Sequence, residues 1–122
     1  MNQPREHNPD GLFHEGLILF NAAQFFEAHE VLEDVWRAAP ELDRKFLQGL
    51  IQIAVALHHH STGNVVGCQS LLQRGLRNLG PYPDRHFGLE LASFRDEMEQ
   101  WRSALEAQLP LPARPVIRFE LG

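Results

Sequence analysis

Hydrophobic residues recur at steps of three and four along most of the chain, which is the spacing of an amphipathic helix. The clearest run lies near the C-terminus and consists of Leu91, Phe94, Met98, Trp101 and Leu105. A second face, near the N-terminus, consists of Leu12, Phe13, Leu17 and Phe20. Alternation of apolar and polar residues, which is typical of strands, is confined to residues 116–121. The pattern therefore predicts an all-α protein.

Capping and turn residues divide the first part of this pattern into helices. Asn8 suits the N-cap of a first helix, with Pro9 at its first helical position. A turn is expected near residues 21–24, followed by a second helix over about residues 25–38. This helix should end before Pro40, because the residue preceding a proline is disfavoured in helical geometry.

The middle of the chain predicts two more helices. A third should follow Pro40 and extend to about residue 60, where residues 61–64 (STGN) are typical of a turn. A fourth is expected over about residues 65–79. Gly80 and Pro81 follow it in the order that commonly ends a helix.

The last helix should give way to an extended arm, because Pro110, Pro112 and Pro115 exclude a helix beyond about residue 108. The connections are short, so neighbouring helices should be antiparallel. We therefore expect one domain over residues 1–122. It is predicted to be a compact bundle of about five antiparallel helices, two hairpins plus a C-terminal helix, with a core at 9–108 and an arm at 109–122.

Composition narrows the setting of this bundle. The chain has 122 residues, of which 43% are hydrophobic and 22% charged, values typical of a globular domain. The net charge of −5 and the absence of a basic stripe argue against nucleic acid. The apolar run at residues 47–57 is shorter than the ~20 residues that cross a membrane. The N-terminus lacks a signal peptide, and Cys68 is the single cysteine, so we expect a cytoplasmic protein.

Polar residues interrupt the core-like pattern of the second helix. On a helical wheel, His29 lies at the edge of the apolar face, and Glu33 lies one turn further on. Glu33 and Arg37 are likewise one turn apart, and Glu30 lies on the same ridge as Arg37. Because Phe26 lies among these charges, we expect this side of the helix to be covered as well.

The third helix carries a matching polar stripe. It is apolar over more than half its circumference, which is typical of a central helix, yet Gln48, Gln52 and His59 align. Gly49 and Ala56 flank the stripe and permit a neighbour to approach closely. Because glutamines on a central helix need hydrogen-bond partners, we predict a polar seam between helices two and three. Its members are His29, Glu30, Glu33, Arg37, Gln48, Gln52 and His59.

These motifs resemble those of a known family. The pattern A-H-E-x-x-E-x-x-W is present as Ala28, His29, Glu30, Glu33 and Trp36, followed by Q-G-L-I-Q at residues 48–52, His58–His60 and the Gly63–Asn64 turn. In this order they resemble the prokaryotic domain-of-unknown-function family number 309, over about residues 12–79. Cys68 is a mild departure, where the family often has alanine. The resemblance implies a compact helical bundle, and it implies no reaction or substrate.

Three functional interpretations remain open, and the sequence does not decide whether the protein is an enzyme. The first is a domain without bound cofactor that binds a small polar ligand or a partner segment, through donors and acceptors of the seam. The second is a metal-dependent hydrolase. The pattern H-E-x-x-E offers His29 and Glu33 as ligands of a divalent metal, with His59 as a third and Glu30 as the general base.

The third interpretation is a structural polar network in a partner of a larger assembly. A loop is predicted at residues 81–88, between the fourth and the last helix, and its aromatic residues Tyr82 and Phe87 could anchor a partner.

Overall fold

The computed structural model of the protein describes residues 9–120 and confirms the all-α bundle. Asn8, the predicted N-cap, lies outside the described residues. Within the described range, none of the helices combines the length and hydrophobicity that a membrane crossing would require. The elements are α1 (Pro9–Asn21), α2 (Phe25–Ala38), α3 (Glu41–Ser61), α4 (Val65–Leu79), β1 (Arg85–His86), β2 (Leu89–Glu90) and α5 (Leu91–Ala107).

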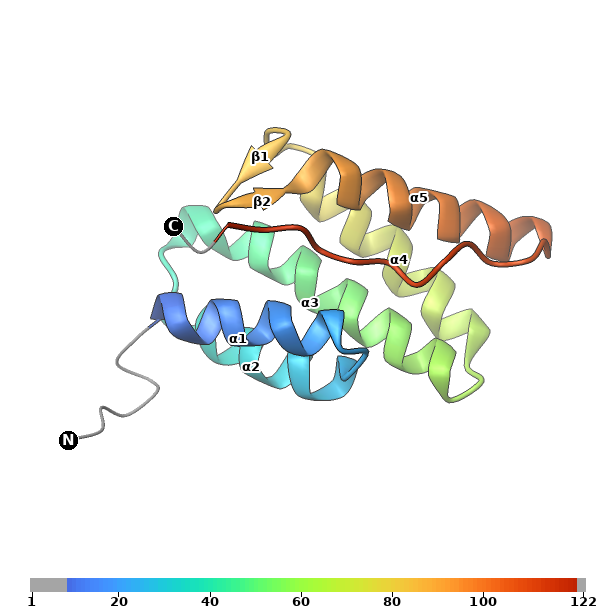
Figure 1. The fold of residues 1–122 in the computed structure, drawn as a ribbon, viewed down its shortest axis with the longest axis horizontal. Helices are drawn as coiled ribbons and strands as arrows, with labels where there is room; N and C mark the ends of the chain where they lie inside the picture. Colours follow the sequence, from blue (N-terminus) through green and yellow to red (C-terminus); the bar gives the residue numbers. More distant parts are fainter. Residues whose placement is uncertain (1–8, 121–122) are drawn as a thin grey trace.

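Helix α3 is the central element (Figure 1). It packs against α4 and α2, while α1 packs on α2 and α5 packs on α4. The C-terminal arm crosses the bundle between α1 and α5 (Figure 1). The short antiparallel hairpin of β1 and β2 falls in a segment where the sequence predicted only a loop. The order of the helices leaves α3 with neighbours on both sides.

Close approach of α3 and α4 depends on two glycines that face each other. A Cβ atom placed on Gly75 would lie 2.6 Å from Cγ1 of Ile53 and 3.0 Å from the carbonyl oxygen of Gly49. A Cβ atom on Gly49 would lie 2.8 Å from Cγ of Leu79. The sequence suggested that Gly49 admits a close neighbour, and α4 is that neighbour. Such contacts let the two backbones pack with little space between them.

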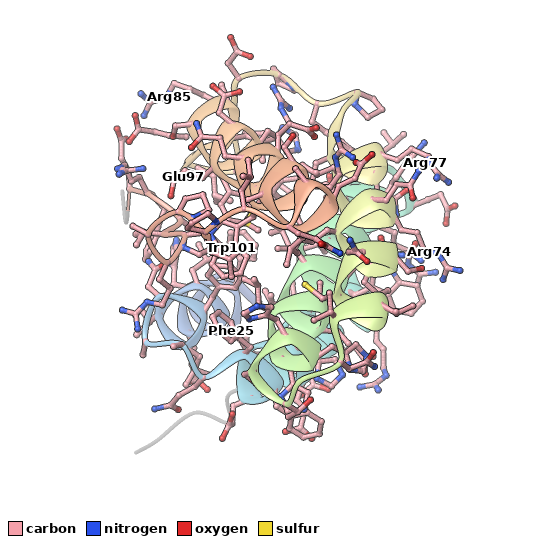
Figure 2. The ribbon with its side chains drawn as sticks, turned by 90° about the vertical axis from the view of Figure 1, so that its right-hand side faces the viewer. Phe25, Arg74, Arg77, Arg85, Glu97 and Trp101 are labelled. Atoms are coloured by element: carbon pink, nitrogen blue, oxygen red, sulfur yellow. The ribbon has the colours of Figure 1, made fainter. Side chains whose placement is uncertain are left out.

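The arm is held by specific hydrogen bonds. Asn21, the last residue of α1, accepts from the backbone N–H of Ile117 at 2.8 Å and donates to its carbonyl at 2.9 Å. The indole N–H of Trp101 donates to the carbonyl of Ala113 at 3.0 Å. Figure 2 shows Trp101 on the inner side of α5, and 8% of it is exposed. The arm therefore covers the space between α1 and α5.

Replacing Gly75 by alanine tests the contact between α3 and α4. Helix propensity alone would make Gly75→Ala stabilising by about 1 kcal/mol. We expect a loss of about 1–3 kcal/mol instead, because the new Cβ overlaps Ile53 and the backbone at Gly49. Urea unfolding measures the difference. Ser70→Ala, at an exposed site on α4, is the control and should change stability by less than about 0.5 kcal/mol. Stabilisation by Gly75→Ala would contradict the packing described here.

Burial should make Cys68 unreactive in the folded protein. Desolvation raises the pKa of the thiol from 9.0 to about 11, so the thiol stays protonated at pH 8. Burial of the neutral thiol contributes to stability at pH values below 9.0, the pKa of the thiol in the unfolded chain. This contribution is lost as the pH rises toward 11, the pKa in the folded protein. A colorimetric disulfide reagent at pH 8 should label Cys68 only after denaturant is added. Rapid labelling of the native protein would contradict its burial.

Candidate functional site

A cleft between α2 and α3 is the first candidate for a functional site. It encloses about 300 Å³ and is lined by Glu33, Trp36 and Arg37 from α2 and by Gln48, Ile51 and Gln52 from α3. Four residues of the predicted seam, Glu33, Arg37, Gln48 and Gln52, therefore lie around one hollow. Because Ile51 belongs to the core cluster, the cleft combines an apolar wall with a polar rim.

A chain of contacts extends the cleft along α2. The Nδ1 atom of His29 lies 2.9 Å from the carbonyl oxygen of Phe26, and its Nε2 atom lies 3.7 Å from the Glu33 carboxylate. Arg37 donates to the same carboxylate at 3.3 Å and to Asp34 at 2.6 Å. The Glu33 charge is therefore shared between an imidazole and a guanidinium at the rim of the cleft.

Three residues of the predicted seam do not line the cleft, namely His29, which contacts Glu33, and also Glu30 and His59. Glu30 is exposed on α2. His59 lies in the last turn of α3, where its Nδ1 atom is 3.5 Å from the side-chain nitrogen of Asn64. The three consecutive histidines have different surroundings, because His58 contacts the ring of Phe26 and His60 meets the ring of Trp101 edge-on.

The seam differs from the prediction in its burial. The sequence suggested an interior network, but none of the polar or charged residues among residues 11–120 is buried. Gln52 accepts a hydrogen bond from Asn78 on α4 at 2.7 Å, rather than from a partner on α2. Gln48 is exposed. The stripe on α3 thus faces outward between α2 and α4, so the two hydrophilic ridges border a cleft instead of pressing together.

The sequence did not predict two of the residues in this region, Trp36 and Arg44, as site residues. The Arg44 guanidinium lies 4.9 Å from the centre of the Trp36 ring and donates to the carbonyl of Arg37 at 3.3 Å. The Nε1 atom of Trp36 and the Nε atom of Arg44 are both buried without a hydrogen-bond partner. The sequence indicated Trp36 only as part of the family motif. Arg44 lies one helical turn before Gln48 and therefore on the same face of α3. This spacing could have indicated Arg44 as a site residue.

The donor groups do not assemble into a metal site of the kind the hydrolase interpretation needs. In the part of the chain that the structure describes, no three or more side chains of His, Cys, Asp or Glu are grouped so that they could hold a metal ion. His29 and Glu33 are near each other, but His59 does not complete the set.

Comparison with known proteins identifies the class of this domain. Residues 13–71 match a family described as "Domain of unknown function (DUF309)". The resemblance deduced from the motifs is confirmed, and this segment belongs to that family. The matched segment contains the whole lining of the cleft, whereas α5 and the arm lie outside it.

Two bacterial relatives carry the same region. An "Uncharacterized protein" of Aquifex aeolicus (strain VF5) is 31% identical over 90 residues, which are 73% of this chain and 27% of that protein. The "Uncharacterized protein YpuF" of Bacillus subtilis (strain 168) is 42% identical over 65 residues, which are 52% of this chain and 37% of that protein. The chain therefore spans well under half the length of these curated relatives.

The ion pairs at the cleft should contribute little to folding. The side chains of Arg37 and Glu33 are 63% and 41% exposed, so water screens their attraction. In a double-mutant cycle of Glu33→Ala and Arg37→Ala, we expect a coupling energy below about 1 kcal/mol in urea unfolding. A coupling of about 3 kcal/mol or more is typical of a buried pair and would support the interpretation as a structural network.

Proposed function

We propose that the cleft between α2 and α3 binds a short polar segment of another polypeptide. The cleft volume of about 300 Å³ is at the lower limit for small-molecule sites and suits one inserted side chain. Beside it, Gln48 and Gln52 occupy successive turns of α3 and present carboxamides that both donate and accept hydrogen bonds. A carboxamide of this kind can bond to the backbone of an extended segment.

The observation that carries the proposal is the pair of buried nitrogen atoms without acceptors. Trp36 lines the cleft, Arg44 lies over its ring, and each has an unpartnered nitrogen. A buried donor without an acceptor costs about 1–3 kcal/mol. A partner that moves the Arg44 side chain and supplies an oxygen atom would recover this free energy. The unbound domain is thus left with donors that binding can satisfy.

The charge of the cleft favours a neutral polar partner. Glu33 and Arg37 compensate each other, so the rim carries little net charge of its own. Trp and Arg are the residues most enriched at the energetic centres of protein interfaces, and here they are supplied by Trp36, Arg37 and Arg44. The hydrolase has less support, because His59 does not join His29 and Glu33 in the described part of the chain. The structural network has less support, because its ion pairs are exposed.

A blocked glutamine tests the proposal directly. The probe is N-acetyl-glutamine N-methylamide, which offers two backbone amides and one carboxamide. The protein has two tryptophans, and the indole N–H of Trp101 is already bonded to Ala113. In a proton–nitrogen correlation spectrum at millimolar probe, we expect the Trp36 indole and the Gln48 and Gln52 amides to shift. The Trp101 indole should stay in place as the internal control.

A matched pair of arginine variants separates binding from general charge effects. Arg37→Glu places a second negative charge beside Glu33 and should abolish the shifts. Arg77 is exposed on α4 and points away from the bundle (Figure 2), so Arg77→Glu should leave the shifts unchanged. Equal shifts in both variants, or movement of the Trp101 indole alone, would contradict binding in this cleft.

A further inference from the structure

A second cavity lies at the end of the bundle where α3 begins. It encloses about 480 Å³ between the start of α1, the connection from α2 to α3, and the turn between β1 and β2. Its lining consists largely of Phe13, Val35, Ala38, Leu47 and Phe87. None of the residues of the cleft between α2 and α3 lines this cavity, so the two are separate sites.

The size and lining suit an organic molecule with an apolar body. A cavity of about 150 Å³ lined by apolar side chains binds benzene, and this one is roughly three times larger. Phe13 and Leu47 are buried members of the core and form fixed walls. The apolar surface of the cavity is therefore preformed. Side chains could not close the cavity unless the core residues also moved.

The wall at the turn is held in an unfavourable backbone conformation. His86 pairs with Leu89, so Phe87 and Gly88 form a two-residue turn with φ angles of 52° and 75°. Asn, Asp and Gly are the residues that prefer the first position of such a turn, and an aromatic residue there is strained. The Phe87 ring nevertheless lies 5.9 Å from the ring of Phe13 and 5.3 Å from that of Phe46, while 45% of the residue is exposed. Strain of this kind is typical of functional sites.

The cavity also contains one carboxylate, that of Asp43. Its backbone N–H bonds to the carbonyl of Pro40, but its side chain makes no hydrogen bond or ion pair within the described part of the chain. The other titratable residue of the lining, His14, is stacked on the Phe119 ring at 5.8 Å. A single unpaired carboxylate in an apolar lining favours a ligand with one positive charge.

We propose that this cavity is a binding site for a small amphiphilic amine. The apolar body of the amine lies between Phe13, Leu47 and Phe87, and its ammonium group bonds to the Asp43 carboxylate. The aromatic rings of the wall add a favourable contact with the cation. The site does not depend on the function proposed for the cleft between α2 and α3.

A pair of probes that differ only in charge tests this site. The probes are 4-phenylbutylamine and 4-phenylbutan-1-ol, titrated into the whole protein and followed by the methyl resonances of Leu47 and Val35. We expect the amine to bind at least about tenfold more tightly than the alcohol, because only the amine forms a charged hydrogen bond with Asp43. The difference should disappear in Asp43→Asn. Asp96→Asn removes an exposed carboxylate on α5 and should retain the difference.

A variant of the turn tests the role of the strained wall. Phe87→Gly removes the aromatic ring but suits the positive φ angle, so the hairpin should keep its conformation. We expect weaker binding of both probes by about tenfold or more, with an unchanged circular dichroism spectrum. Failure of both probes to bind the wild-type protein at millimolar concentration would overturn the proposal. Equal affinity of the amine and the alcohol, or shifts confined to Trp36, Gln48 and Gln52, would overturn it as well.

Discussion

The burial of α3 between α2 and α4 is the constraint on which the rest of the structure depends. Most of its circumference is apolar and enclosed, and Gly49 lets α4 approach along one side. In the middle of the helix, the stripe that contains Gln48 and Gln52 is left facing outward. A helix fixed in this way is a rigid support, and rigid elements hold the side chains of a binding site more accurately than loops do.

Both candidate sites use this support. Ile51 forms part of the cleft lining, and Leu47, one turn earlier on α3, forms a wall of the apolar cavity. Adjacent residues of α2 divide in the same way, since Trp36 lines the cleft and Val35 lines the cavity. The cleft belongs wholly to the segment shared with the family, whereas the cavity is completed by Phe87, beyond that segment.

Periodicity was sufficient to predict the helices, because each carries a continuous apolar face and most are followed within a few residues by Gly or Pro. It also brought together Glu33, Arg37, Gln48 and Gln52, since residues one turn apart must share a helix face. It did not predict how α2 and α3 are rotated about their axes, which decides whether a stripe is buried or exposed. The partners of Gln52 and Arg44 depend on that rotation. The turn at Phe87 was missed because an aromatic residue there contradicts the usual preference for such turns.

Native-state hydrogen exchange measures most directly whether α3 is the fixed centre of this domain. Amides of Leu47–Leu57 should exchange only through global unfolding, with protection that matches the free energy from urea unfolding. Amides of the C-terminal arm should exchange through smaller openings, because separate side-chain contacts hold the arm to α1 and α5 instead of a continuous series of backbone hydrogen bonds. If the α3 amides exchanged through openings with a lower free energy than those that expose the α5 amides, α3 would not be the fixed centre.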